Sequence, residues 1–310
     1  MRLYEGGFGD RAELERLVRV IADKTIADED VRVSVELGSM VDVAGGARRA
    51  GRFVSPSAHR LPPESKLGLV ELSSPKTAHG KLVILLAATG EEGFWFRRRF
   101  SELLNAKGIA TLSLENAFYG ARRPAGQRAS FVRTVRDQFA MNVATVQEAR
   151  GLALWARENG YREVCLTGFS QGGLMASFAA SLTPFEVAAC PRGAGDAATP
   201  IFTNAALSRR IHWQRLASDL GGEAAARDYF RACLEPVRIS RFPAPAGARA
   251  AVLLGVRGDG FVPAREVLAL HRHWPGSELR WLTSSHVIAA LLHSASHQQA
   301  ICDSLERIST

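Results

Sequence analysis

A serine lies at the centre of the five-residue motif Gly168–Gly172, which reads Gly-Phe-Ser-Gln-Gly. An apolar run at 164–167 precedes this motif, and a run of small residues at 173–177 follows it. This order of strand, tight turn and helix is that of a nucleophile elbow, which holds a serine in a strained backbone conformation. The glycines at both ends of the motif suit such a turn because the neighbours of the serine must be nearly free of side chains. We therefore predict that Ser170 is a nucleophile.

A serine hydroxyl becomes reactive only when a base removes its proton and a third group orients that base. In chains built around a nucleophile elbow, the acid follows the serine and the histidine follows the acid. Asp259 comes after the apolar run that ends at Val256, and glycines on both sides let its loop turn sharply. The alternative interpretation is an ordinary Asp-Gly turn. Asp196 and Asp303 are poorer candidates, since one lies in an insertion and the other in the last predicted helix.

Three histidines follow the predicted acid. His286 lies just beyond the last predicted strand, where a loop can bring its imidazole over the serine, and we predict that it is the base. His293 and His297 are four residues apart in the predicted final helix. This spacing can hold a metal, but no H-E-x-x-H pattern accompanies it. We expect both to be solvated or interfacial helix residues, and we predict no metal and no cofactor.

The negative charge that develops on a tetrahedral intermediate needs two preorganised hydrogen-bond donors, which form an oxyanion hole. One donor is expected to be the backbone N–H of Gln171, directly after the serine. The other is expected in the loop after the apolar run at 82–88, and Thr89 is the candidate by its position.

Predicted strands and helices alternate from about residue 80 onward. The predicted strands are 82–88, 109–114, 164–167, 187–190, 251–256 and 279–282, and the main predicted helices are 96–107, 132–157 and 287–308. Continuous apolar strands of this kind are typical of a parallel sheet with helices on both faces. The predicted fold class is therefore α/β, an α/β-hydrolase fold with a mostly parallel central sheet.

Two regions depart from the alternation of strands and helices. Residues 1–65 form a predicted N-terminal extension with an amphipathic helix, followed by a Gly- and Arg-rich loop at 38–52; the apolar face of the helix carries Leu14, Leu17, Val18 and Ile21. Residues 191–245 contain predicted helical pieces at 205–217 and 224–234. In this fold, an insertion at that point is normally a cap over the active site. We predict one domain, 1–310.

Composition narrows the function classes. No apolar run reaches the roughly 18 residues of a membrane span, and the N-terminus has no apolar signal core, so we expect a cytoplasmic protein. Cys165, Cys190, Cys233 and Cys302 are scattered, as expected for reduced core thiols. The chain has 39 basic and 31 acidic residues, a formal net charge of +8. This excess favours anionic partners or marks a solvated surface. No basic stripe alternates with aromatic residues, so we expect no nucleic acid as partner.

Several separated motifs make the chain resemble the α/β-hydrolase domain-containing protein 18 family over roughly residues 51–306. The most distinctive is the stretch 114–124, and the others are 51–62, 88–99, the Ser170 elbow, 202–203, 211–213 and 274–276. The resemblance implies a triad of Ser170, Asp259 and His286. The chain departs from the family pattern at Ala117, at Gln171 and at the serine pair before His286, which affects loop geometry rather than the reacting groups. Eukaryotic members are associated with mitochondria and lipid metabolism.

We therefore expect a serine hydrolase that cleaves a carboxylic ester through an acyl-serine intermediate. A lipid or other amphipathic ester is favoured because cap residues such as Phe202, Ile211, Trp213 and Leu216 could hold an acyl chain. Arginines near 115–124 either meet an anionic headgroup or pair with Glu115 and neighbouring carboxylates. Contact with an anionic membrane would be peripheral. An acyltransferase, a peptidase and a non-catalytic binding scaffold stay open as alternatives, and so does the oligomeric state.

Overall fold

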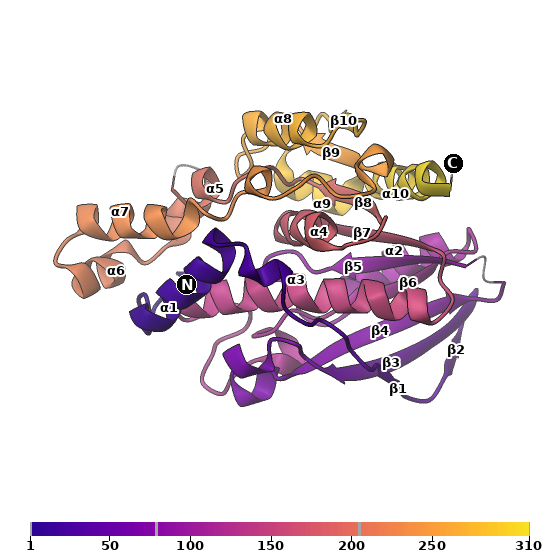
Figure 1. The fold of residues 1–310 in the computed structure, drawn as a ribbon, viewed down its shortest axis with the longest axis horizontal. Coiled ribbons are helices and arrows are strands. Elements are labelled where there is room, and N and C mark those ends of the chain that lie inside the picture. The colour runs from indigo at the N-terminus through magenta and orange to yellow at the C-terminus, as the bar shows by residue number, and fades with distance from the viewer. Residues whose placement is uncertain (1, 78–79, 204–205, 310) are drawn as a thin grey trace.

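The computed structural model describes residues 2–77, 80–203 and 206–309 (Figure 1). Within these residues lies a ten-stranded sheet of order β1-β3-β4-β6-β5-β7-β8-β9-β10, with β2 paired to β3. Its parallel part consists of β5 (Lys81–Leu86), β6 (Ala110–Leu114), β7 (Glu163–Phe169), β8 (Ala188–Arg192), β9 (Val252–Val256) and β10 (Glu278–Leu282). The antiparallel part consists of β1 (Glu36–Leu37), β2 (Val41–Val43), β3 (Gly46–Val54) and β4 (Leu67–Pro75).

The predicted α/β-hydrolase fold is confirmed, and the six predicted strands are the six parallel strands of the sheet. Because these strands run in the same direction, their carboxyl ends meet at one edge of the sheet. Loops that leave this edge are brought together in space, which is where ligands bind in open α/β sheets.

Helices cover both faces of the sheet, as alternate side chains of β5 show. Leu82, Ile84 and Leu86 belong to one core cluster, whereas Val83 and Leu85 belong to another. The first cluster includes side chains of α1 (Arg11–Ala22), α3 (Val135–Glu158), α4 (Gln171–Leu182) and α8 (Ala264–His273). The second includes side chains of α2 (Trp95–Asn105) and α10 (Ser294–Ser309). Apolar burial on both faces explains why the parallel strands read as unbroken apolar runs.

Capping sets where the long helices begin. The Asp10 side chain accepts a hydrogen bond from the Glu13 backbone N–H at the start of α1, and the Thr134 side chain accepts one from the Asp137 N–H at the start of α3. Each bond satisfies a backbone donor that has no partner inside the helix. Among the described helices, none combines the length and the apolarity that crossing a membrane requires.

The segment between β8 and β9 forms α5 (Thr199–Thr203), α6 (Trp213–Leu220) and α7 (Glu223–Leu234). In Figure 1 these helices extend beyond the left end of the sheet, next to α1. The helical piece predicted at 205–217 is only partly right: Ala205 lies outside the described residues, and 206–210 form a 3-10 helix. The α-helix begins at Trp213 because the His212 ring accepts a hydrogen bond from the Arg215 N–H.

The loop predicted at 38–52 is wrong, because most of it forms β2 and β3. Gly45, with a φ of +87°, makes the turn between them. All nine residues of β3 pair with β4, from Gly46 opposite Pro75 to Val54 opposite Leu67. Backbone pairing to a neighbouring strand therefore overrides a composition that is typical of loops.

The single final helix predicted at 287–308 is also wrong. The structure has α9 (His286–Leu292) and α10, separated at His293, whose φ of −94° and ψ of 33° interrupt the helix. This break lets α9 lie at the carboxyl edge while α10 packs under β7, β8 and β9.

Candidate active site

Ser170 connects β7 to α4 in a turn that few residues tolerate. Its φ of 54° and ψ of −117° are strained for a residue with a side chain. A Cβ atom on Gly168 would lie 2.4 Å from the carbonyl carbon of Gly172, and one on Gly172 would lie 2.5 Å from the Leu86 oxygen. Both positions therefore require glycine. The turn places Ser170 at the carboxyl edge, at the start of α4 and beside β5.

His286 and Asp259 form a close pair at the same edge. The His286 Nδ1 and Asp259 Oδ2 atoms are 2.6 Å apart. The other Asp259 oxygen accepts hydrogen bonds from the backbone N–H groups of Phe261 and Val262, at 2.7 and 2.9 Å, and the Asp259 side chain is only 2% exposed. Asp259 is thus both a turn residue and the partner of the imidazole. His286 is the first residue of α9 rather than a loop residue, because Ser285 caps that helix.

The imidazole of His286 is held between two aromatic rings. Its centroid lies 4.7 Å from that of Phe169 and 5.0 Å from that of Phe261. Gly193 leaves space beside these rings, since a Cβ atom there would lie 2.8 Å from Phe169 and 3.5 Å from the His286 ring. Ser170 and His286 line the same pocket. The Ser170 side chain makes no capping bond to α4, so its hydroxyl can rotate toward this pocket.

The backbone N–H groups of Thr89 and Gln171 have no hydrogen-bond partner within the described chain. Both residues line the pocket. Their side chains are joined, because Thr89 Oγ1 donates to Gln171 Oε1 at 3.0 Å, and Gln171 Nε2 donates to Asn142 Oδ1 at 2.9 Å. The two candidate oxyanion donors are therefore neighbours with free N–H groups.

Glu115, which was expected only to pair with nearby arginines, and Arg97, to which no role was given, hold the loop of Thr89. The Glu115 carboxylate accepts a hydrogen bond from the Gly93 N–H at 2.6 Å. Arg97 is 3% exposed, pairs with Glu91 at 2.6 Å and donates to the backbone oxygens of Leu85 and Leu114. Both residues lie in the stretches 88–99 and 114–124, which carry the family resemblance. The sequence therefore marked these stretches but did not indicate what the two side chains do.

Arg122 does not serve the headgroup role considered for the arginines at 115–124. Its side chain and that of Glu148 are both completely buried, with a 2.6 Å ion pair between them. Arg122 also donates to the backbone oxygens of Glu115 and Ser65. Arg123 pairs instead with Glu92 at 2.9 Å. The pairing interpretation is correct for both arginines, although their carboxylate partners are Glu148 and Glu92.

A cavity of about 440 Å³ opens beside Ser170. Its wall is mostly apolar and includes Leu174, Met175, Phe202, Phe230, Leu234 and Val237. Of the cap residues expected to hold an acyl chain, Phe202 lines this cavity. Ile211, Trp213 and Leu216 do not line it, and their side chains are buried in the core instead. The segment between β8 and β9 therefore contributes to the pocket through α5, α7 and the 3-10 helix at 206–210.

The expectation that His293 and His297 are solvated or interfacial is wrong for His297. This side chain is 1% exposed, packs against the rings of Phe100 and Phe169, and donates from Nε2 to the Ala289 oxygen at 2.8 Å. Burial, together with the charge of Arg192, lowers the pKa of His297 to about 3. His297 is thus a neutral core residue. Within the described residues, no group of three His, Cys, Asp or Glu side chains could hold a metal ion.

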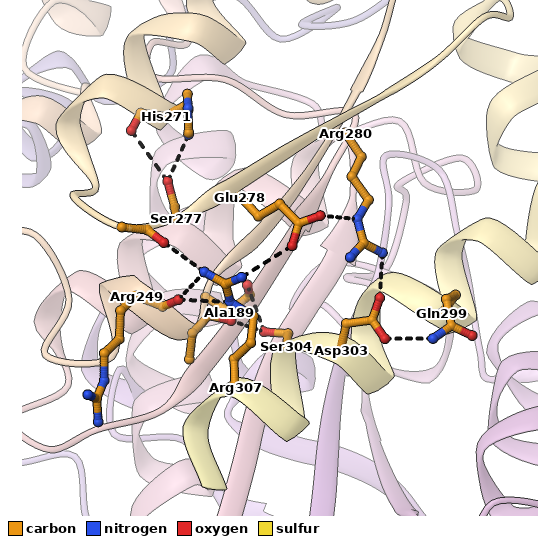
Figure 2. Close-up of polar contacts among 12 residues, drawn as sticks. Ala189, Arg249, His271, Ser277, Glu278, Arg280, Gln299, Asp303, Ser304 and Arg307 are labelled. Carbon is orange, nitrogen blue, oxygen red and sulfur yellow. Dashed lines mark hydrogen bonds and ion pairs between the residues drawn. The ribbon is translucent and has the colours of Figure 1, made fainter. Parts of the chain in front are cut away.

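The two other acid candidates have structural partners. Asp196 is 1% exposed and binds Arg238 and Ser240, which fastens the insertion to the end of β8. Asp303 on α10 pairs with Arg280 of β10 at 2.6 Å (Figure 2). In the same network Arg280 pairs with Glu278. These contacts tie α10 to the strand that precedes His286, and none of the three residues lines the pocket.

Comparisons with known proteins agree with this architecture. The family model described as alpha/beta hydrolase domain containing 18 matches residues 1–228 and 222–307. Among solved structures, acetyl xylan esterase 1 from a Thermoanaerobacterium species superposes with a TM-score of 0.64 at 13% identity, covering 97% of this chain and 96% of that one. An acetyl xylan esterase from a Paenibacillus species superposes with a TM-score of 0.58 at 14% identity, covering 91% of this chain and 92% of that one.

Est1E from Butyrivibrio proteoclasticus, with ferulic acid bound, gives a TM-score of 0.55 at 16% identity, covering 88% of this chain and all 100% of that one. Identities this low show the shared fold. The family match spans nearly the whole chain, and it includes the elbow, the Asp259 loop and His286. The chain belongs to the alpha/beta hydrolase domain containing 18 family.

Proposed function

We propose that this protein is a serine hydrolase that cleaves a carboxylic ester through an acyl-enzyme intermediate. Ser170 is the nucleophile, His286 is the general base and acid, and Asp259 orients the imidazole. The observation that carries the proposal is the 2.6 Å contact between His286 Nδ1 and Asp259 Oδ2 at a pocket that Ser170 also lines. Hydrolases of this kind need that constellation of nucleophile, base and orienting acid.

The proposed reaction has two halves. In the first, Ser170 Oγ attacks the ester carbonyl carbon while its proton passes to His286 Nε2, and His286 then gives that proton to the departing alkoxide. In the second, His286 takes a proton from water as the water oxygen attacks the acyl carbon. The bond from that carbon to Ser170 Oγ then breaks, the proton passes from His286 to Ser170 Oγ, and the carboxylic acid leaves. Asp259 keeps the Nδ1 proton in place, so that Nε2 is free to accept. The N–H groups of Gln171 and Thr89 stabilise the oxyanion in both halves.

We propose a lipid or another amphipathic acyl ester as the substrate class. The pocket wall is largely apolar, with Phe202, Phe230 and Leu234 facing the same cavity as Met175. Such a wall favours an acyl chain over a sugar or a peptide because it offers few hydrogen-bond partners. A cavity of about 440 Å³ is large enough for a medium-length chain rather than for an acetyl group alone.

Steady-state hydrolysis of a series of p-nitrophenyl esters with lengthening acyl chains tests this proposal. We expect turnover by the parent protein, none by Ser170→Ala, and a kcat/KM that rises from acetate to medium-chain esters. Met175→Trp narrows the pocket without touching the reacting groups, and it should shift the preference toward short esters. The absence of turnover on every ester would refute the hydrolase assignment, and an acetate preference in the parent would refute the substrate class.

A further inference from the structure

Helix α9 exposes a group of large apolar side chains next to the pocket. Val287, Ile288, Leu291 and Leu292, called here the apolar rim, are 56%, 48%, 50% and 75% exposed. The same helix is anchored by His286 and Ala289, which are buried. Single exposed apolar residues are normal on a protein surface, but four on one short helix mark a surface that meets an apolar partner.

The apolar rim is continuous with the pocket. Val287 and Leu291 line the cavity while remaining about half exposed, so they lie at its mouth. Ile288 and Leu292 do not line the cavity, and they extend the apolar surface outward from the mouth. An apolar molecule that arrives beside α9 therefore meets apolar side chains from the rim to the pocket.

Charge is distributed unevenly around the mouth. From Trp281 to Cys302 the chain has no Asp, Glu, Lys or Arg, so nothing charged accompanies the apolar rim on its own segment. Arg210 also lines the pocket, and both Arg209 and Arg210 are exposed and have no ion pair within the described chain. Their segment is tied to the loop of Asp259, because the Ala206 N–H donates to the Gly260 oxygen at 3.1 Å. Arg210 therefore places one cation without an ion pair on the pocket that the apolar rim borders, and Arg209 is its exposed neighbour in the chain.

We infer that this face docks the protein on an anionic lipid surface, with the apolar rim among the lipid acyl chains and Arg209 and Arg210 on phosphate headgroups. The inference rests on the proposed function, for which it supplies the route of the substrate. An apolar surface beside unpaired cations is the combination that binds anionic bilayers, since burial and electrostatic attraction act together. The formal net charge of +8 acts in the same direction.

Vesicle co-sedimentation tests the inference with Ser170→Ala protein, which binds without turnover. The vesicles contain either equimolar phosphatidylcholine and phosphatidylserine or phosphatidylcholine alone. We expect binding to the anionic vesicles, and we expect Ile288→Ser/Leu292→Ser to weaken it by at least about tenfold. Arg209→Gln should weaken it by about fivefold. The matched control is Met40→Ser/Val41→Ser, at positions 66% and 61% exposed but outside the pocket lining, which should bind like the parent.

Hydrolysis of soluble p-nitrophenyl acetate separates this inference from the proposed function. Ile288→Ser/Leu292→Ser and Arg209→Gln, introduced with Ser170 intact, should leave that turnover unchanged, because Ile288, Leu292 and Arg209 do not line the pocket. Equal vesicle binding by the parent, the rim variant and the Arg209 variant would overturn the docking inference while leaving the hydrolase assignment intact. A rim variant that changes the molar mass in light scattering but not vesicle binding would assign the surface to a second copy of the chain. Vesicle binding with the expected pattern and no ester turnover would refute only the hydrolase assignment.

Discussion

Replacing Asp259 by asparagine changes one atom but reverses the hydrogen bonding around His286. The oxygen that accepts from the Phe261 and Val262 N–H groups must remain an oxygen, since those bonds of 2.7 and 2.9 Å admit no second donor. The new amide nitrogen therefore faces His286 Nδ1. An NH₂ group there requires Nδ1 to accept, which moves the imidazole proton to Nε2. A protonated Nε2 cannot take the proton of Ser170.

We expect Asp259→Asn to lower kcat by about 10,000-fold, the scale seen when a triad imidazole is held in the wrong tautomer. This corresponds to about 5.5 kcal/mol in the activation barrier. Stability should fall by less than about 1.5 kcal/mol because the number of hydrogen bonds is preserved. The assay is hydrolysis of p-nitrophenyl acetate, with urea unfolding in parallel. Asp303→Asn is the matched control and should keep parental turnover, since Asp303 pairs with Arg280 away from the pocket. Parental turnover in folded Asp259→Asn protein would refute the reasoning.

Three further predictions concern other polar groups. His286→Ala should abolish ester hydrolysis while His293→Ala retains most of it; an active His286→Ala protein of normal circular dichroism would contradict this. Arg122→Gln leaves a buried carboxylate unpaired, so it should lower the free energy of unfolding by about 3–5 kcal/mol, whereas the half-exposed Arg123→Gln should cost less than about 1 kcal/mol; equal losses in urea unfolding would argue against it. His297 has a pKa lowered from 6.5 to about 3. Because the unfolded chain takes up this proton between those values and the folded chain does not, stability falls as the pH falls through that window. As the pH falls from 6.5 to about 4, the free energy of unfolding of His297→Gln should therefore decrease by about 3 kcal/mol less than that of the parent. Parallel plots of this free energy against pH would refute the prediction.

The parallel part of the sheet could be predicted because burial on both faces leaves an unbroken apolar run. The antiparallel part could not. Strand β3 is largely half-exposed and contains three arginines and two glycines, so neither an apolar run nor a regular alternation marks it. Its strand conformation comes from pairing with β4, a contact between segments that local patterns do not encode.

The residues of the proposed triad could likewise be predicted from the sequence, whereas the side chains that support them could not. Ser170, Asp259 and His286 each follow a parallel strand, and the chain order of such residues predicts that they meet at one edge. Which side chains support them depends on tertiary packing. The i,i+4 spacing of His293 and His297 says nothing of Phe100 and Phe169, the rings that enclose His297.

The most direct test of the central claim is intact mass spectrometry after treatment with a fluorophosphonate. Such a probe reacts with a serine only when a neighbouring base activates its hydroxyl. We predict a single adduct on the parent protein, none on Ser170→Ala, and almost none on His286→Ala, in which the serine is present without its base. An adduct that persists in folded Ser170→Ala protein, or no adduct on the parent, would contradict the assignment of Ser170 as the nucleophile.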